Sequence, residues 1–319
     1  MEFGFGLPTR GPLSSPEHLV TLARRGEEMG FNMISVSDHV VIPRSIDSRY
    51  PYSETGEFAG GDSGACLEQL TTLSFLANAT SSMRLLTSVM VLPHRSPVLT
   101  AKMLASIDVL SMGRLNVGCG VGWMREEFEA IGAPPFDERG AVGDEYIRAF
   151  KELWTSDNPS FDGTYCRFSD ISFLPKPVQK PHPPIWIGGE SPPALRRAAR
   201  LGDVWYPIGR NPRFTVGTPE EYQASVTRLR RFAEAADRDP ATIGLAYSAS
   251  WLNDREAQRL PNGERQPLTG SPEQVAGDIK TFADIGVRHF MFNFQSDTLA
   301  TTLARMERFA TRVRPHVGG

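Results

Sequence analysis

Cysteine is scarce in this chain, with three among 319 residues. Cys66, Cys119 and Cys166 form no CxxC or CxxH grouping, so the sequence indicates neither a zinc site nor a disulfide framework. The dinucleotide pattern GxGxxG is missing where glycines gather, and no Lys-Ser/Thr pair follows them. A phosphate loop of the Walker type is therefore excluded.

Runs of one kind of charge and long apolar runs are missing as well. The 34 Lys and Arg residues are dispersed against 37 Asp and Glu residues, which argues against nucleic-acid binding. No apolar run is long enough to cross a membrane, and the start MEFGFGLP is typical of a strand rather than a signal peptide. We expect a soluble, cytoplasmic protein.

Alternating strands and helices occupy the whole length, which suits a single domain over residues 1–319. The hydrophobic segments predict eight strands: Phe3 to Leu7, Met33 to Ser37, Arg84 to Val91, Leu115 to Val117, Ile185 to Ile187, Val204 to Pro207, Thr242 to Ser248 and Arg288 to Phe294.

A helix is predicted after each strand from periodicity and from capping residues such as Ser15 and Ser271. These helices cover Pro16 to Met29, Leu67 to Thr80, Pro97 to Leu110, Asp144 to Trp154, Ser191 to Leu201, Pro219 to Ala236, Pro272 to Ile285 and Asp297 to Arg314. Eight strand-helix pairs with uniformly hydrophobic strands predict a (β/α)8 TIM barrel with insertion loops. A doubly wound sheet is the alternative, but it usually carries fewer repeats.

The stretch GRLNVGCGVGWMREEFE, residues 113–129, has glycine at every second position after a short strand. Gly118, Gly120 and Gly122 would bare one face of the backbone, because side chains alternate along a strand. Such a face could receive a flat ring. An ordinary tight strand-to-helix turn is the other interpretation.

In a TIM barrel the active site lies at the carboxyl ends of the strands. Asp38 and His39 follow the second predicted strand, and His39 is the best candidate for a general acid or base. A histidine that only holds its loop is the alternative. Metal catalysis is not indicated, because the strand ends offer only Asp38, His39 and Glu190 as ligands. We interpret His94 as a loop residue.

A second strand end, Gly188-Gly189-Glu190-Ser191, leads directly into a helix. Unpaired N–H groups at a helix start can bind a phosphate. Ser191 is also a natural N-cap, and the two roles are compatible.

Three segments together resemble the luciferase-like flavin and deazaflavin oxidoreductases. They are ISVSDHV at 34–40, GRLNVGCGVGWMREEFEAIG at 113–132 and PKPVQKPHPPIWIGGESPPALRRAARLGDVW at 175–205. The resemblance spans nearly the whole chain and favours the branch that uses coenzyme F420, a 5-deazaflavin. It implies a TIM-like barrel that binds the cofactor ring at the strand carboxyl ends.

The resemblance also implies roles by position. Asp38 would hydrogen-bond the polar edge of the ring, and His39 would lie over its reacting face. A non-prolyl cis peptide is implied between Ser88 and Val89, beneath the ring. The remaining implied cofactor contacts are Gly120, Val121 and Gly122 along the ring, and Gly188, Gly189, Glu190 and Ser191 at the phosphate.

Two departures refine this expectation. Trp123 stands where sugar-phosphate dehydrogenases of the deazaflavin branch carry a glutamate, which suggests a more apolar substrate. No arginine lies near Val121, where oxygen-using members have been associated with one for the FMN phosphate, although Glu190-Ser191 looks like the phosphate contact of that branch. We therefore expect an F420-dependent oxidoreductase that transfers a hydride between the deazaflavin and a small organic substrate, with an FMN-dependent monooxygenase that uses O2 as the alternative. We also expect a homodimer and a pocket shaped by loops 43–65 and 253–269.

Overall fold

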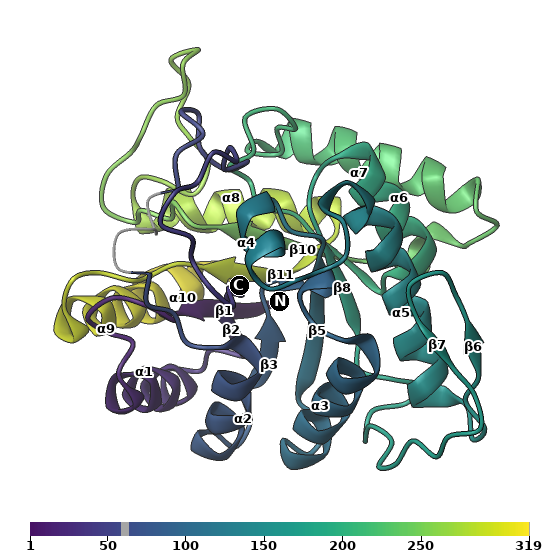
Figure 1. Ribbon diagram of the computed structural model, residues 1–319. Helices are drawn as coiled ribbons and strands as arrows, with labels where there is room; N and C mark the ends of the chain where they lie inside the picture. The colour runs from purple at the N-terminus through teal and green to yellow at the C-terminus, as the bar shows by residue number, and fades with distance from the viewer. Residues whose placement is uncertain (59–63, 319) are drawn as a thin grey trace.

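The computed structural model describes residues 1–58 and 64–318, and within them eight parallel strand positions close into a barrel (Figure 1). The order is β3-β2-β1-β11-β10-β9-β8-β5, and pairing of β3 with β5 closes the ring. The prediction of a (β/α)8 barrel is confirmed. The barrel strands are β1 (Glu2–Leu7), β2 (Met33–Val36), β3 (Arg84–Thr87) with its continuation β4 (Met90–Val91), β5 (Leu115–Gly120), β8 (Ile185–Gly188), β9 (Val204–Tyr206), β10 (Gly244–Ala249) and β11 (Val287–Phe292).

The helices pack around the outside of this barrel, as Figure 1 shows. Two of them, α3 and α8, have the predicted bounds, and Ser271 forms a full capping box with Gln274 at the start of α8. The helices are α1 (Pro16–Glu28), α2 (Gln69–Ala79), α3 (Pro97–Leu110), α4 (Arg125–Ala130), α5 (Arg139–Thr155), α6 (Pro192–Leu201), α7 (Pro219–Glu234), α8 (Pro272–Ile285), α9 (Leu299–Arg308) and α10 (Arg314–Val317).

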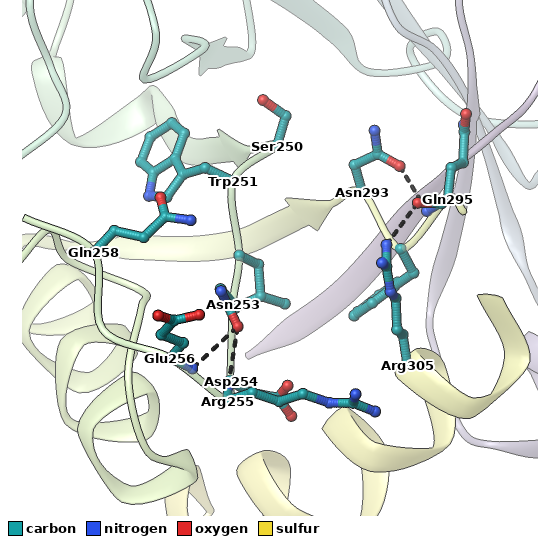
Figure 2. Close-up of a pocket in the computed structure, with 12 residues that line it drawn as sticks. Ser250, Trp251, Asn253, Asp254, Arg255, Glu256, Gln258, Asn293, Gln295 and Arg305 are labelled. Atoms are coloured by element: carbon teal, nitrogen blue, oxygen red, sulfur yellow. Dashed lines mark hydrogen bonds between the residues drawn. The ribbon is translucent and has the colours of Figure 1, made fainter. Parts of the chain in front are cut away.

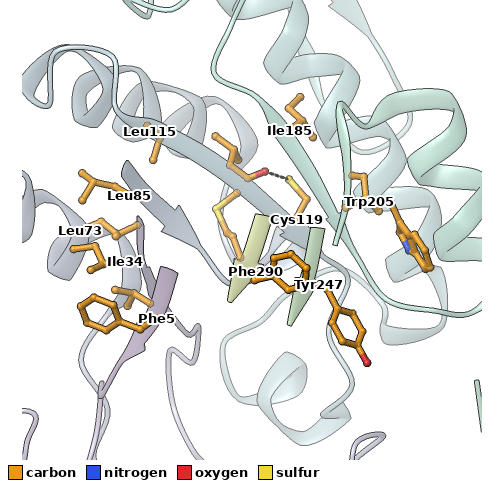
Figure 3. Close-up of a cluster of buried hydrophobic side chains, with 14 of the residues drawn as sticks. Phe5, Ile34, Leu73, Leu85, Leu115, Cys119, Ile185, Trp205, Tyr247 and Phe290 are labelled. Carbon is orange, nitrogen blue, oxygen red and sulfur yellow. Dashed lines mark hydrogen bonds between the residues drawn. The ribbon is translucent and has the colours of Figure 1, made fainter. Parts of the chain in front are cut away.

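Side chains on each strand alternate between two apolar layers. Ile34, Leu85 and Leu115 lie in register on β2, β3 and β5 and point outward into the layer beneath the helices, part of which Figure 3 shows. Their neighbours Met33 and Leu86 point into the barrel, where a smaller cluster fills the interior. Because both faces are buried, the strands carry apolar residues at almost every position.

Four local features differ from the sequence predictions. The predicted strand Arg84 to Val91 is interrupted at residues 88–89, and α5 begins at Arg139 rather than Asp144. Among the early glycines of α5, Gly143 packs too closely against Val121 for a side chain, since a Cβ there would lie 2.9 Å from Val121. The excursion 158–184 contains a short hairpin, β6 (Phe161–Asp162) with β7 (Arg167–Phe168). The closing helix is divided by a π-helical turn over Phe309–Val313.

Two further observations concern the segments between and beyond these elements. Part of the predicted loop 43–65, residues 59–63, lies outside the described residues. Nowhere in 1–58 or 64–318 does a helix combine the length and apolar character that a membrane crossing requires.

Candidate active site

A pocket of about 480 Å³ opens at the carboxyl ends of β2, β4, β5 and β8. Its volume is in the range of small-molecule and cofactor sites. The pocket brings together ten of the eleven residues that the sequence predicts for the site: Asp38, His39, Ser88, Val89, Gly120, Val121, Gly122, Gly188, Gly189 and Ser191. Glu190 is the exception.

Ser88 and Val89 form one wall of the pocket. The peptide bond between them is cis, as the resemblance implies. The Val89 side chain occupies the room that two glycines leave free: a Cβ on Gly120 would lie 2.6 Å from Val89 Cγ2, and one on Gly188 would lie 2.9 Å from Val89 Cγ1. A Cβ on Gly118 would overlap the Thr87 carbonyl oxygen. The alternating glycines therefore make room for neighbouring protein atoms. They do not leave an exposed backbone face for a flat ring.

His39 is held by a buried carboxylate, which the sequence analysis did not single out. Its Nδ1 lies 2.9 Å from Oε2 of Glu127, whose side chain is 2% exposed. Burial alone would raise the pKa of Glu127, but the His39 hydrogen bond and the nearby histidines more than offset it and lower the pKa. Since an ionised carboxylate only accepts hydrogen bonds, the Nδ1 atom carries the proton. When the imidazole carries a single proton, Nε2 is then the ring atom that can accept another.

Glu127 also fixes the backbone that follows His39. Its Oε1 accepts the N–H groups of Val40 at 2.7 Å and Val41 at 3.3 Å. Its neighbour Glu126 accepts the N–H groups of residues 47 and 48 at 2.8 and 2.9 Å. Two consecutive glutamates on α4 thus hold the loop after β2. Both glutamates stand directly after the glycine stretch in the sequence, but the sequence analysis assigned them no role.

His94 lies in the segment between β4 and α3 and also lines the pocket, which the sequence analysis did not predict. It lies in a short 3-10 turn after β4, with its Nδ1 3.8 Å from Glu127 Oε1 and its ring edge-on to Phe128. Neither ring nitrogen has a hydrogen-bond partner among the described residues. Burial lowers the pKa of His94. A buried ring with two unsatisfied nitrogens is open to a ligand.

The Asp38 carboxylate is hydrogen-bonded to neighbouring groups of the protein. Its oxygens accept hydrogen bonds from Arg95 Nη1 and Nη2, at 2.8 and 2.7 Å, and from the Val91 N–H at 2.8 Å. Arg95 also pairs with Glu68 at 2.7 Å. Burial alone would lower the pKa of Arg95, but the two carboxylates raise it well above its ordinary range. Asp38 therefore anchors β4 and Arg95, and its implied contact with a ring stays a prediction.

An aromatic cluster forms the rim. Ring centroids of Tyr50, Phe58 and Trp123 lie 5.1 to 5.3 Å from one another, and Phe58 lies 5.3 Å from the His39 ring. The Arg10 guanidinium lies 4.9 Å from the Phe58 centroid, and its Nη1 has no hydrogen-bond partner in the described part of the chain. This rim presents apolar faces next to His39, as the tryptophan at position 123 suggested.

The far end of the pocket contains two arginines that the sequence analysis did not associate with the site. Arg139, at the start of α5, donates to the Gly122 carbonyl at 3.3 Å, and burial lowers its pKa. Arg197 on α6 is buried, pairs with Asp144 and donates to the Gly140 carbonyl. Helices distant in sequence from Val121 thus supply arginines at this end of the pocket, which the sequence analysis did not expect.

Ser191 and Glu190 have different roles in the adjoining turn. Ser191 caps α6 by accepting the Ala194 N–H at 3.4 Å, and Gly189 has a φ of +100°, which favours glycine. Glu190 points the other way: its oxygens accept the Ile208 N–H at 2.6 Å and Asn211 Nδ2 at 3.0 Å. Burial raises its pKa to about 7. Its carboxylate thus holds the loop after β9, and its implied contact with a phosphate stays a prediction.

A second hollow, of about 380 Å³, opens beyond the ends of β10 and β11 (Figure 2). Asn253 accepts the N–H groups of residues 255 and 256 there, and Arg305 donates to the Gln295 carbonyl. Loop 253–269 lines this hollow and is tied to α8 and α9 by Arg265–Asp278 and Arg308–Asp254 pairs. No described residue of loop 253–269 lines the first pocket. The prediction that this loop shapes the active-site pocket is therefore wrong.

The fold and the pocket define a (β/α)8 barrel with a carboxylate-held histidine at the strand carboxyl ends. A family model described as "Luciferase-like monooxygenase" matches residues 1–261. The chain belongs to this family, whose members are generally oxidoreductases, including monooxygenases.

Individual relatives differ in cofactor. An FMNH2-dependent dimethylsulfone monooxygenase of Pseudomonas putida is 39% identical over 197 residues, which cover 60% of this chain and 52% of that protein. The match thus spans about half the length of that relative. The monooxygenase RslO1 from Streptomyces bottropensis superposes with a TM-score of 0.76 at 26% identity, covering 99% of both chains. An F420-dependent secondary alcohol dehydrogenase shares the fold, with a TM-score of 0.74 at 18% identity over 99% and 98% of the two chains.

Proposed function

We propose that this protein is an oxidoreductase that transfers a hydride between coenzyme F420 and a small, largely apolar organic substrate. The observation that carries the proposal is the His39–Glu127 pair. It fixes Nδ1 of His39 and leaves Nε2 at the wall of a pocket with an aromatic rim. A group placed in this way can take or return the proton that accompanies hydride transfer.

The pocket fits a flavin-type cofactor by the chemistry of its free groups. The buried, unpartnered nitrogens of His94 and Arg10 would meet polar edges of a ring, and the Val89 side chain offers it an apolar surface. The α6 N-terminus, Arg139 and Arg197 would hold a phosphate. When bound, a deazaflavin supplies two-electron hydride chemistry with little reaction toward oxygen.

The protein's own contribution is positioning, proton handling and exclusion of water. Glu127 orients His39, while Asp38 and Arg95 hold the segment that carries Val89 and Val91. Tyr50, Phe58 and Trp123 would cover the substrate with apolar surface. Water kept out of such a site strengthens each of these electrostatic contacts.

An FMN-dependent monooxygenase is the second candidate, and one observation favours it. Arg139 and Arg197 place cations at the phosphate end, where the sequence suggested none, and the dimethylsulfone monooxygenase that resembles this chain depends on FMNH2. Parallel fluorescence titrations of the purified protein with F420 and with FMN decide between the two. We expect tighter binding of F420. FMN binding of equal or greater strength would replace the first candidate by the second.

We also propose that the protein is a homodimer that joins through α2 and α3. Leu99, Met103 and Leu110 recur along one side of α3, and Leu99 and Leu110 are 59% and 69% exposed. Phe75 on the neighbouring α2 is 46% exposed. Light scattering of the wild type should give twice the chain mass, and Leu99→Lys combined with Leu110→Lys should give a monomer.

A further inference from the structure

A third hollow lies between α5 and α6, outside the barrel mouth, and has a volume of about 610 Å³. Its notable feature is positive charge. Four arginines line it, Arg148 from α5 and Arg196, Arg197 and Arg200 from α6. Three of the four are exposed in the described structure, and only Arg197 is buried.

The carboxylates in this hollow form no ion pair with the three exposed arginines. Asp144 pairs with Arg197, and Glu145 directs its oxygens to the N–H groups of residues 164, 165 and 166 at 2.6 to 2.9 Å. No carboxylate in the described part of the chain lies within ion-pair distance of Arg148, Arg196 or Arg200. Like charges gathered around one hollow favour an anionic ligand.

The hollow continues from the phosphate end of the active site. Gly140, Pro193 and Arg197 line both spaces. Arg197 therefore stands at the boundary, with the Ser191 cap of α6 on the active-site side. A ligand anchored by its phosphate at this boundary could extend into the hollow without leaving the protein surface.

We infer that the hollow between α5 and α6 binds an anionic chain that the cofactor carries beyond its phosphate. This inference rests on the proposed function. Coenzyme F420 carries such a chain, an oligoglutamate, whereas FMN ends at its phosphate. The three exposed arginines match a flexible row of carboxylates, each contact being weak and sensitive to salt. The hollow thus accounts for selection of F420 by its tail.

The test compares the affinity of F420 with several glutamates and F420 with none, by fluorescence titration at low and high salt. For the wild type we expect the glutamate chain to tighten binding about tenfold at low salt and to lose this advantage at high salt. Replacement of Arg148, Arg196 and Arg200 by Gln should abolish the difference while leaving the affinity for tail-less F420 unchanged. That unchanged affinity also shows that the variant is folded.

A matched control replaces three arginines outside the hollow, Arg230, Arg231 and Arg312, by Gln and should keep the dependence on the tail. Tail-independent binding by the wild type, or equal loss in the control variant, would overturn the inference and leave the proposed function standing. Failure of every F420 form to bind, with FMN binding, would overturn both.

Discussion

Glu127→Gln tests how the protein controls His39. In the wild type one carboxylate oxygen accepts the His39 Nδ1–H at 2.9 Å, and the other accepts the Val40 and Val41 N–H groups at 2.7 and 3.3 Å. Glutamine keeps the shape but offers one oxygen and one NH2 group. Its oxygen is required by two backbone N–H groups, so its NH2 must face His39. The proton on His39 then moves from Nδ1 to Nε2.

The energetic cost follows from the change in hydrogen-bond type. A hydrogen bond to a buried charge contributes about 1.5–3 kcal/mol, and a neutral one about 0.5–1.5 kcal/mol. The variant should therefore lose about 1–2 kcal/mol of unfolding free energy. Its turnover should fall by about a hundredfold to ten-thousandfold, because Nε2 no longer accepts a proton. Cofactor affinity should change little, since Glu127 does not contact the phosphate end.

The assay is nitrogen-15 NMR of labelled histidine, which distinguishes the two tautomers, combined with urea unfolding. Glu126→Gln is the matched control, because it removes the same charge from the same helix but contacts only residues 47 and 48. We expect the control to keep the wild-type tautomer. A Glu127→Gln protein with Nδ1 still protonated and with normal turnover would refute the reasoning.

Three further outcomes are expected. Because burial raises the pKa of Glu190 from 4.5 to about 7, the folded state binds the proton more tightly and loses stability as pH rises between these values. The free energy of unfolding, measured with urea, should fall by about 3 kcal/mol over this pH range in the wild type and should not fall in Glu190→Gln. Equal pH profiles of stability for the two proteins would contradict this expectation. Asp38→Asn should cost about 3 kcal/mol of unfolding free energy by leaving Arg95 with one carboxylate, and an unchanged urea midpoint would exclude that role. His39→Ala should lower turnover by about a hundredfold to ten-thousandfold with little change in the Kd of the cofactor, whereas normal turnover with weak cofactor binding would make His39 structural.

Much of the fold could be predicted because it depends on local patterns. Strand positions, the bounds of α3 and α8, and the cap at Ser271 follow from hydrophobic runs and from residues within one turn. The start of α5 was mispredicted because Gly143, which is unfavourable in a helix locally, is needed for packing against Val121.

The site was predictable only where it lies at strand ends. Asp38, His39 and the Ser88–Val89 peptide follow strands directly, so their convergence was predicted. Glu127 and Arg139 reach the same pocket from helices, and Glu127 meets His39 across 88 positions of sequence. No local pattern records such a contact. The direction of Glu190 was equally hidden, because its partners lie in another loop.

The central claim is hydride exchange with F420, and the most direct measurement compares two reactions of the purified protein. In the first, reduced F420 is incubated without oxygen with a panel of small ketones, aldehydes and activated alkenes, and its reoxidation is followed by absorbance. In the second, FMNH2 is supplied with oxygen and oxidisable apolar substrates. We predict protein-dependent reoxidation of F420 that His39→Ala slows at least a hundredfold, with no product in the second reaction. Oxygenated product from FMNH2, with no reoxidation of F420 by any substrate, would contradict the account.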